Sequence, residues 1–298
     1  MTDTALTLDR RQLLAGLGAT TALSLSGCAT AARPEMVAKA NAIAAERLLE
    51  VVGYNLLRHE PERATGLGVD SGAHAALRSR LEDQSPAGQQ AFAATLREDL
   101  ARVRAFPREG LDADTVTSLE VVESAYASAL DGFALPYGDV AVGSWRNAPY
   151  VVIQNVGSYL DLPRFMDSTH PLEDGDDADA FTARLEAIPT ALAGELERMQ
   201  AARAMGVIPP GFLLDKAEAA MVTTLKSAMA GQLFAEPLRA RSKAKGLVET
   251  WANRARTLET GPIAVALERQ LAELRTARSR AGNDAGMWAQ PRGDEWYG

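Results

Sequence analysis

The sequence predicts an all-α protein of about seven helices with one loop-rich insert. Alanine is abundant and aromatic residues make up only 6% of the 298 positions, a composition that favours helices over strands. Apolar side chains recur at three- and four-residue spacing along most of the chain. Hydrophobic residues reach 47%, which is enough for one large core or two small ones.

The first 32 residues are typical of an export signal rather than of a folded domain. Arg10 and Arg11 stand before a weakly apolar run, Leu13 to Leu25, which is too short for a stable transmembrane anchor. Paired arginines before such a run favour the twin-arginine route. We therefore expect residues 1–32 to direct export to the periplasm and residues 33–298 to form the helical domain.

A lipidation motif is expected at the end of this signal. The stretch "LSGC" resembles a bacterial lipobox, in which Cys28 becomes the lipidated first residue of the mature protein. Cys28 is also the only cysteine, which excludes an intrachain disulfide. Cleavage after "ATA" by ordinary signal peptidase is the alternative. Alanine follows Cys28, which favours outer-membrane anchoring in similar lipoproteins, so the expected contact with the membrane is through the lipid alone.

Helices are expected first over residues 35–58, where Pro61 should end the helix. "EPERATGLGVDSG" reads as a loop because it is rich in turn residues. Ser85 and Pro86 suit the N-cap and first position of a helix reaching residue 104. Asp112 or Asp114 should cap the next helix, over residues 114–131.

Further helices are expected after the acidic stretch "LEDGDDADA". Asp177 or Asp179 should begin a helix that reaches Met205, with a kink at Pro189 and an end at Gly206. Three more helices complete the prediction, over residues 214–231, 236–260 and 262–281, with breaks between Gly231 and Pro237 and at Gly261-Pro262.

Between these two groups, residues 132–172 form the loop-rich insert. "PYVVIQ" is the one β-like run in the sequence, and it is short. The insert combines aromatic faces with hydrogen-bonding groups, which suits a substrate cleft but equally suits a buried loop that satisfies its own backbone. The candidate cleft-lining residues are Trp145, Asn147, Tyr150, Gln154, Tyr159 and His170.

The charge balance bears on possible partners. The net charge is -8 and the isoelectric point is about 5.1. An acidic surface argues against non-specific binding of nucleic acid.

The motifs for catalysis or metal binding are incomplete. "HEPER" begins like His-Glu-x-x-His, but the fifth residue is Arg63 and Pro61 interrupts the helix, so two imidazoles cannot share one helix face. Glu120 and Glu123 are interpreted as part of a solvated helix face. "DGDDAD" lacks the glycine and the closing glutamate of a calcium loop, and acidic residues there suit a helix start. The sequence therefore assigns no catalytic, cofactor-binding or metal-ligating residue.

A family resemblance adds to this reading. "PERATGLGVD", "APYVVIQNVGSYLDLPRFMDSTHPLED", "DADAFTARLEAIPTAL" and "GVIPPGFLLDK" together resemble a large family of exported bacterial proteins that is catalogued as a domain of unknown function. The similarity covers nearly all of residues 40–298. The family looks related to zincin metallopeptidases of the carboxypeptidase Taq kind, whose full-length members carry a His-Glu-x-x-Pro-Gly-His zinc motif in their second half.

The resemblance implies that this chain is the N-terminal helical half of such a protein. Zinc is implied for full-length members, but no cofactor is expected on this chain because the zinc motif is absent from the sequence. On this interpretation the chain is a scaffold and cleft wall, inactive alone, for a peptide-like small molecule. Trp288, Trp296 and Tyr297 would pack against a missing or separate C-terminal catalytic half. A natural short homologue that acts as a helical ligand- or partner-binding lipoprotein is the alternative.

Overall fold

The computed structural model describes residues 33–143, 148–248 and 250–296, and this part of the chain is all-α, as predicted. It contains ten α-helices where the sequence predicted about seven, because two segments read as loop are helical and one expected helix is split. The elements are α2 (Arg33–His59), α3 (Pro61–Gly66), the 3₁₀ helix η1 (Gly72–Ser79), α4 (Pro86–Ala105), α5 (Ala113–Phe133), α6 (Ser158–Ser168), α7 (Gly175–Ala204), α8 (Gly211–Met229), α9 (Ala235–Ala244), α10 (Thr250–Leu258), the π turn η2 (Glu259–Ile263), α11 (Ala264–Arg278), and the 3₁₀ turns η3 (Met287–Ala289) and η4 (Gly293–Trp296).

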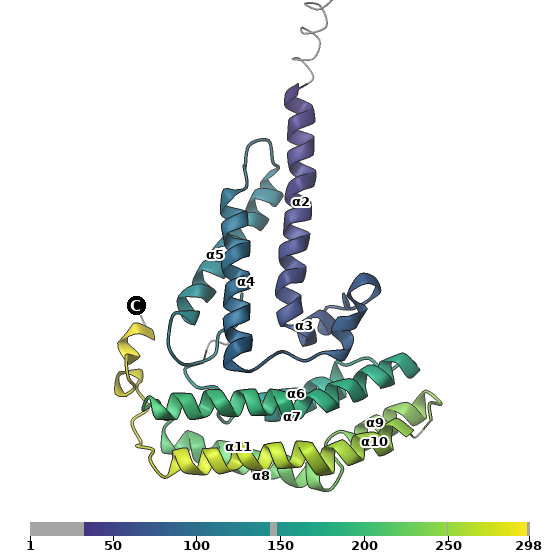
Figure 1. Cartoon of the computed structure of the whole chain (residues 1–298), viewed down its shortest axis with the longest axis vertical. Helices are drawn as coiled ribbons and strands as arrows, with labels where there is room; N and C mark the ends of the chain where they lie inside the picture. The colour runs from purple at the N-terminus through teal and green to yellow at the C-terminus, as the bar shows by residue number, and fades with distance from the viewer. Residues whose placement is uncertain (1–32, 144–147, 249, 297–298) are drawn as a thin grey trace, which may run out of the picture.

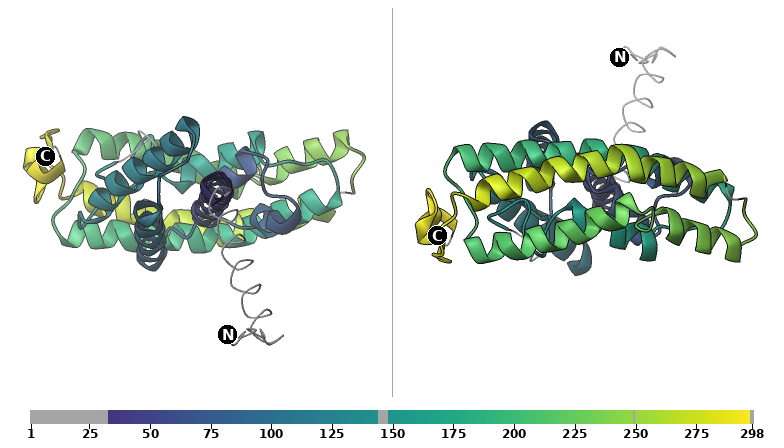
Figure 2. Two further views of the ribbon diagram at one scale, coloured as in Figure 1. Left: turned by 90° about the horizontal axis from the view of Figure 1, so that it is seen from above. Right: turned by 90° about the horizontal axis from the view of Figure 1, so that it is seen from below.

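The helices form two groups. Helices α2, α4 and α5 stand upright on a layer made by α6 to α11 (Figure 1). Within that layer α11 packs between α7 and α8, and the three run side by side along its length (Figure 2). Each group has its own buried apolar cluster, one centred on Leu96 and Leu119 and the other on Phe181 and Leu267.

Two of the predicted helix starts in the upright group are confirmed with their caps. The Ser85 hydroxyl accepts the Gly88 N–H at 3.0 Å, and Asp112 accepts the Thr115 N–H at 2.8 Å. These bonds satisfy backbone donors that a helix start otherwise leaves unpaired. The apolar side chains on one face of α4 are buried: Phe92, Leu96, Leu100 and Val103.

Helix α7 begins earlier than predicted, and its cap is neither Asp177 nor Asp179. Asp174 accepts the Asp177 N–H at 3.0 Å and is the N-cap. Asp177 is instead buried inside the first turn and forms an ion pair with Arg78. The helix continues through Pro189 as one element. Gly206 follows it with a φ of 86°, as expected of a glycine after a helix end.

The prediction of a loop after α2 is wrong in two places, where the chain is helical. Pro61 does not merely end α2 but starts α3 as its first residue, a position where the missing proline N–H costs nothing. Residues Gly72–Ser79 form η1. Both elements are short, so periodicity over a long window does not detect them.

The insert is more helical than predicted. Helix α6 occupies Ser158–Ser168 and contains Pro163. "PYVVIQ" forms no strand in the described residues; two isolated bridges, Asp139 with Ala148 and Ile153 with Val156, are the extended pairings there. Gly157 precedes α6 with a φ of 128°, a conformation that side chains other than glycine rarely adopt.

The C-terminal helices differ from the prediction in two places: one expected helix is divided, and one expected break is absent from the structure. The expected helix over 236–260 is two helices, α9 and α10, and Gly246 lies between them with a φ of 70°. Gly261-Pro262 is not a break, because η2 joins α10 to α11 as a π turn. A π turn accommodates proline within a helix because it already disrupts the regular hydrogen-bond ladder.

The last described residues fold back onto the end of α7. Gln290 bonds both the N–H and the carbonyl of Ile208, at 3.1 and 3.0 Å, and Tyr137 donates to the Pro291 carbonyl at 2.7 Å. Trp288 is 79% exposed. The side chain of Trp296 and all of Tyr297 lie outside the described residues.

Candidate functional site

An open cleft of about 690 Å³ is the most extensive site to consider. It lies where the upright group meets the layer: α3, the 82–84 segment and residues 139–143 form one side, and the start of α6 with α7 forms the other. Ligand sites in proteins commonly have this size and are concave. The cleft is therefore the first place to look for function.

Carboxylic side chains dominate the lining of this cleft. Six of them line it, against two guanidinium groups, those of Arg63 and Arg164. The six are Glu60, Glu62, Glu82, Asp139, Asp161 and Glu195. Uneven charge in a concave site concentrates ions of the opposite sign, although Glu60 is paired with Arg63 and Asp139 with Arg198.

Three glutamates from two segments meet on one side of the cleft. Glu62 accepts the backbone N–H of Glu82 with both carboxylate oxygens, at 3.3 and 3.2 Å. Glu60 lies at the start of α3 and pairs with Arg63 at 2.9 Å. Their proximity follows from the fold, since Glu82 is twenty residues from Glu62 in the chain.

The pKa values of these glutamates are raised. Burial raises the pKa of Glu60 and of Glu62. The pKa of Glu82 is raised well above the ordinary value, first by burial and then by repulsion from Glu62, Asp139 and Glu60. Like charges held together disfavour the ionised forms. A cation placed among these carboxyl groups would relieve that repulsion and favour their ionised forms.

Glu195 forms the floor of the cleft from within α7. It is 3% exposed, and its carboxylate accepts the N–H and hydroxyl of Ser158 at 2.7 and 2.8 Å and the Gln270 amide at 2.9 Å. Burial raises the pKa of Glu195 to about 7, against the lowering effect of these hydrogen bonds. A carboxyl group with a pKa near neutrality can gain or lose a proton under physiological conditions.

The close approach of α7 to the 82–85 segment depends on Gly194. A Cβ atom at this position would lie 2.6 Å from the Ser85 nitrogen and 2.8 Å from the Gln84 carbonyl carbon. Both are backbone atoms that cannot rotate away. Gly194 thus lets the helix carrying Glu195 come near the segment carrying Glu82.

Arg198, one turn after Glu195, holds the loop side of the cleft. It binds Asp139 at 2.6 Å, the Gly138 carbonyl at 2.9 Å and the Gln84 side chain at 3.2 Å. These contacts join α7 to both segments that carry acidic lining residues. Because Arg198 is only 9% exposed, its charge needs such partners.

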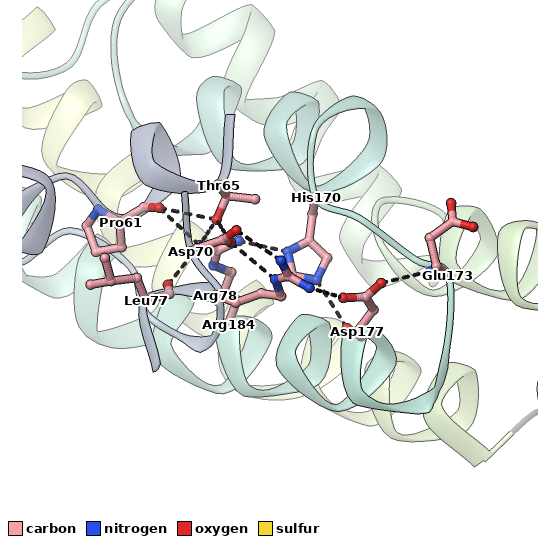
Figure 3. A network of polar contacts seen from close by, with 9 residues as sticks. All are labelled: Pro61, Thr65, Asp70, Leu77, Arg78, His170, Glu173, Asp177 and Arg184. Atoms are coloured by element: carbon pink, nitrogen blue, oxygen red, sulfur yellow. Dashed lines mark hydrogen bonds and ion pairs between the residues drawn. The ribbon is translucent and has the colours of Figure 1, made fainter. Parts of the chain in front are cut away.

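Behind α3, a buried network fixes the segment that carries Glu60 and Glu62 (Figure 3). Arg184 of α7 is fully buried and donates to the Thr65 hydroxyl at 2.8 Å and to His170 Nδ1 at 2.7 Å. It also donates to three backbone carbonyls, those of Pro61, Leu77 and Arg80. One guanidinium therefore anchors α3 and η1 to α7.

A second arginine extends this network. Arg78 binds Asp70 at 3.0 and 3.2 Å and Asp177 at 2.8 Å, and Asp70 also accepts the Thr65 hydroxyl at 2.7 Å. The hydrogen bonds from Arg78 and Thr65 hold the pKa of Asp70 below its usual value in spite of burial. Each buried charge in the network thus has a partner, which is the condition for tolerating it.

The candidate residues from the sequence that the structure describes lie apart from the acidic lining. Trp145 and Asn147 lie outside the described residues, as do Arg10, Arg11 and Cys28. Tyr150 belongs to a small apolar cluster, and Gln154 is half-buried with its Oε1 atom unpaired within the described structure. Tyr159 is buried and donates to the Ile153 carbonyl at 2.9 Å, and His170 is buried against Arg184. The insert does contribute Val151, Val156, Gly157 and Ser158 to the cleft.

Sequence reasoning missed the acidic residues of the cleft. Glu60 and Glu62 were read as polar residues of a helix end and loop, and Glu82 belongs to a separate segment. Glu195 did carry a signal, because it falls on the same stripe as Ile188 and Leu192, both buried. A charged residue on the apolar stripe of a helix marks a buried and partnered group.

The residues that could hold zinc do not converge. Within the described structure no group of three His, Cys, Asp or Glu side chains is placed to hold a metal ion. The histidines are engaged separately: His59 bonds the Thr95 hydroxyl at 2.9 Å, His74 stacks on Tyr54, and His170 meets Arg184. Among the described residues, the three imidazoles therefore lie in separate surroundings.

The other acidic groups singled out in the sequence have structural contacts. Glu123 pairs with Arg104 at 3.0 Å and with Arg108 at 3.4 Å on the surface of α5, and Asp174 of "DGDDAD" caps α7. In the described part of the chain, no helix is both long and apolar enough to cross a membrane.

Comparisons with known proteins give a family and a fold. The family model described as "Bacterial protein of unknown function (DUF885)" matches residues 61–298. A crystal structure described as that of "the putative lipoprotein from Colwellia psychrerythraea" matches with a TM-score of 0.77 at 18% identity. The match covers 86% of this chain and 45% of that chain, so this chain spans less than half of its length. No curated protein matches.

Proposed function

The chain belongs to the DUF885 family of bacterial proteins, and on that premise we propose that it is an exported, lipid-anchored protein whose acidic cleft binds the ammonium group of a peptide-like ligand. The single observation that carries the ligand assignment is the cleft itself, with six carboxylic side chains and two guanidinium groups in its lining. The ligand class follows from charge complementarity and from the family resemblance to peptidases.

Two observations support export and anchoring. Arg10, Arg11 and Cys28 stand in the order of a twin-arginine signal followed by a lipobox, and the structural neighbour from Colwellia psychrerythraea is described as a lipoprotein. Metabolic labelling with a fatty acid followed by membrane fractionation tests this. Cys28→Ser should abolish labelling and release the protein into the periplasm, and paired Arg10→Lys and Arg11→Lys changes should retain the precursor in the cytoplasm.

The ammonium group would bind between the two acidic sides of the cleft. Glu60 and Glu82 on one side and Asp161 at the start of α6 on the other offer carboxylates to a cation. Ionised carboxylates form strong, short hydrogen bonds with ammonium groups. Since a cation stabilises the ionised forms of carboxyls whose pKa values are raised, its affinity should increase as the pH rises above 4.5.

Calorimetric titration with alanyl-alanine tests this binding, and N-acetyl-alanyl-alanine is the control because it has no ammonium group. Glu82→Gln should weaken binding of alanyl-alanine about tenfold or more, since it removes one charge-assisted contact. Glu120→Gln, on the exposed face of α5, is the matched control and should change nothing. Equal binding of the two dipeptides would contradict the proposal.

We further propose that this cleft is one wall of a zinc peptidase site whose metal-binding residues lie outside this chain. The family resemblance supports this. The chain alone should then hydrolyse no peptide. Purified protein with stoichiometric zinc and peptidase activity would overturn this part of the proposal, and co-purification with a chain bearing the zinc motif would support it.

A second candidate is a helical binding lipoprotein without catalysis. Its support is that Val151, Val156, Gly157 and Ser158 of the insert line the cleft, as a ligand-binding loop would. Ligand-dependent thermal stabilisation together with no activity in the presence of any co-purified partner would favour it.

A further inference from the structure

A second pocket, of about 500 Å³, lies beside the acidic cleft. One face of α4, the segment that follows α5 and the last turns of α7 enclose it. Val140 and Val151 border both cavities, so the two are neighbours across residues 138–140. Nothing in the proposed function uses this second pocket.

The charge of the second pocket is opposite to that of the cleft. No carboxylic side chain is among its lining residues, whereas two guanidinium groups, those of Arg97 and Arg198, are. Arg198 already pairs with Asp139 at 2.6 Å. Arg97 is exposed and makes no side-chain hydrogen bond or ion pair with the described residues, so its charge is free for a ligand.

The rest of the lining combines the two amides of Gln89 and Gln90 with an apolar part. Phe133, Leu135 and Tyr137 come from the end of α5 and the segment after it, and Met205 comes from the end of α7. Small residues, Ala93 on α4 and Ala201 on α7, leave the space open between the helices. A ligand that fills this pocket must therefore have an apolar body as well as a negative charge.

We infer that this pocket binds a carboxylate that carries an apolar group. The carboxylate lies against the guanidinium of Arg97, whose planar donors match two carboxylate oxygens. The apolar group lies against Phe133 and Leu135, where burial of its surface adds affinity. The same chemistry is found at the C-terminal residue of a peptide with an apolar side chain and in a medium-chain fatty acid.

Titration calorimetry with four probes tests this inference on the mature protein. N-acetyl-leucine represents the peptide source and octanoate the fatty-acid source, and their amides, N-acetyl-leucinamide and octanamide, keep the shape without the charge. We expect at least one acid to bind at least tenfold more tightly than its amide. The tighter of the two acids identifies the source.

Three variants locate the binding. Arg97→Gln should reduce the affinity for the acid to that for the amide, and Ala201→Phe should block the pocket for both. Arg47→Gln removes the same charge from an exposed position on α2 and should leave the affinity unchanged. Circular dichroism should show the native helix content in Arg97→Gln, because the Arg97 side chain makes no hydrogen bond or ion pair with the described residues. If Ala201→Phe does not fold, the titrations of Arg97→Gln alone test the inference.

The remaining outcomes overturn the inference. Acid and amide binding equally well would show that the guanidinium plays no part, and an equal loss in Arg47→Gln and Arg97→Gln would show only a general effect of net charge. No binding of either acid at millimolar concentration would exclude the site. Glu82→Gln should not affect these titrations, so failure here is distinguishable from failure of the cleft proposal.

Discussion

Arg184 Nη1 donates a hydrogen bond to His170 Nδ1 across 2.7 Å in the buried centre of the molecule. Because a guanidinium has no lone pair to offer, His170 Nδ1 must be the acceptor and the ring proton must lie on Nε2. That atom faces the Asp177 carbonyl at 3.2 Å, which accepts the proton. Burial and the neighbouring Arg184 charge lower the pKa of His170 to about 4, so this ring is neutral at physiological pH.

The first prediction concerns that proton. Nuclear magnetic resonance of the ring nitrogens should show His170 as the neutral Nε2–H form from pH 7 down to about 4. The folded state then binds fewer protons than the unfolded state between pH 4 and the ordinary value of 6.5. Stability from this group is therefore full above pH 6.5 and is lost as the pH falls through that window, by about 3 kcal/mol. A ring that titrates near 6.5 would contradict the assignment.

The second prediction concerns Arg184 itself. Arg184→Met removes the donors to Thr65, His170 and three backbone carbonyls, and each buried acceptor left unpaired costs free energy. Urea unfolding should show a loss of about 3–5 kcal/mol in the free energy of unfolding. Arg254→Met removes an exposed pair with Glu186 and should cost less than about 1 kcal/mol. Similar losses in the two variants would show that the network is not anchoring α3.

The third prediction concerns Glu195, for which stability changes with pH in the opposite direction to that expected for His170. Its pKa is raised to about 7, so the folded state binds more protons than the unfolded state between pH 4.5 and 7. The contribution of Glu195 to stability is therefore greatest at acidic pH and declines as the pH rises through that window, by about 3 kcal/mol. Comparing urea unfolding of wild type and Glu195→Gln at pH 4.5 and pH 7 isolates this change. A stability difference that is independent of pH would show that folding does not shift the pKa of Glu195.

The fourth prediction concerns the approach of α7 to the cleft. Gly194→Ala brings a Cβ atom within 2.6 Å of the Ser85 nitrogen, so the helix or the segment must shift, at a cost of about 1–3 kcal/mol. The shift should also separate Glu195 from Glu82 and weaken binding of alanyl-alanine.

Gly53→Ala is the matched control for this change. Gly53 lies within α2, and no atom lies within 4 Å of its Cβ position. The alanine should stabilise α2 by up to about 1 kcal/mol. Thermal unfolding measures the stability of both variants. Destabilisation of equal size in the two would indicate a general loss of helix flexibility rather than a clash at Gly194.

Local signals in the sequence predicted much of the fold. The stripe of Phe92, Leu96, Leu100 and Val103 and the caps Ser85 and Asp112 act over distances of one or two helical turns, so the sequence contains them complete. Boundaries that depend on distant residues were predicted wrongly. Asp174 caps α7, whereas Asp177 pairs with Arg78 of η1, a tertiary contact that no local pattern contains.

The cleft was hardly predictable for the same reason. Glu62, Glu82 and Glu195 are ordinary surface residue types, and only the packing of α3 and α7 brings their carboxylates into one concave, partly desolvated site. The raised pKa values arise from that proximity and burial, which no single segment shows.

The sequence by itself determined that this chain is helical, that its first residues resemble an export and lipidation signal, and that its motifs for zinc are incomplete. Helical periodicity, caps and short motifs are encoded within a few neighbouring residues, which is why they can be read directly. The tertiary structure alone decided where charge accumulates: an acidic cleft and a cationic, partly apolar pocket on neighbouring sides of residues 138–140. Electrostatic fields and desolvation depend on distances between side chains far apart in the chain, and only folding sets those distances.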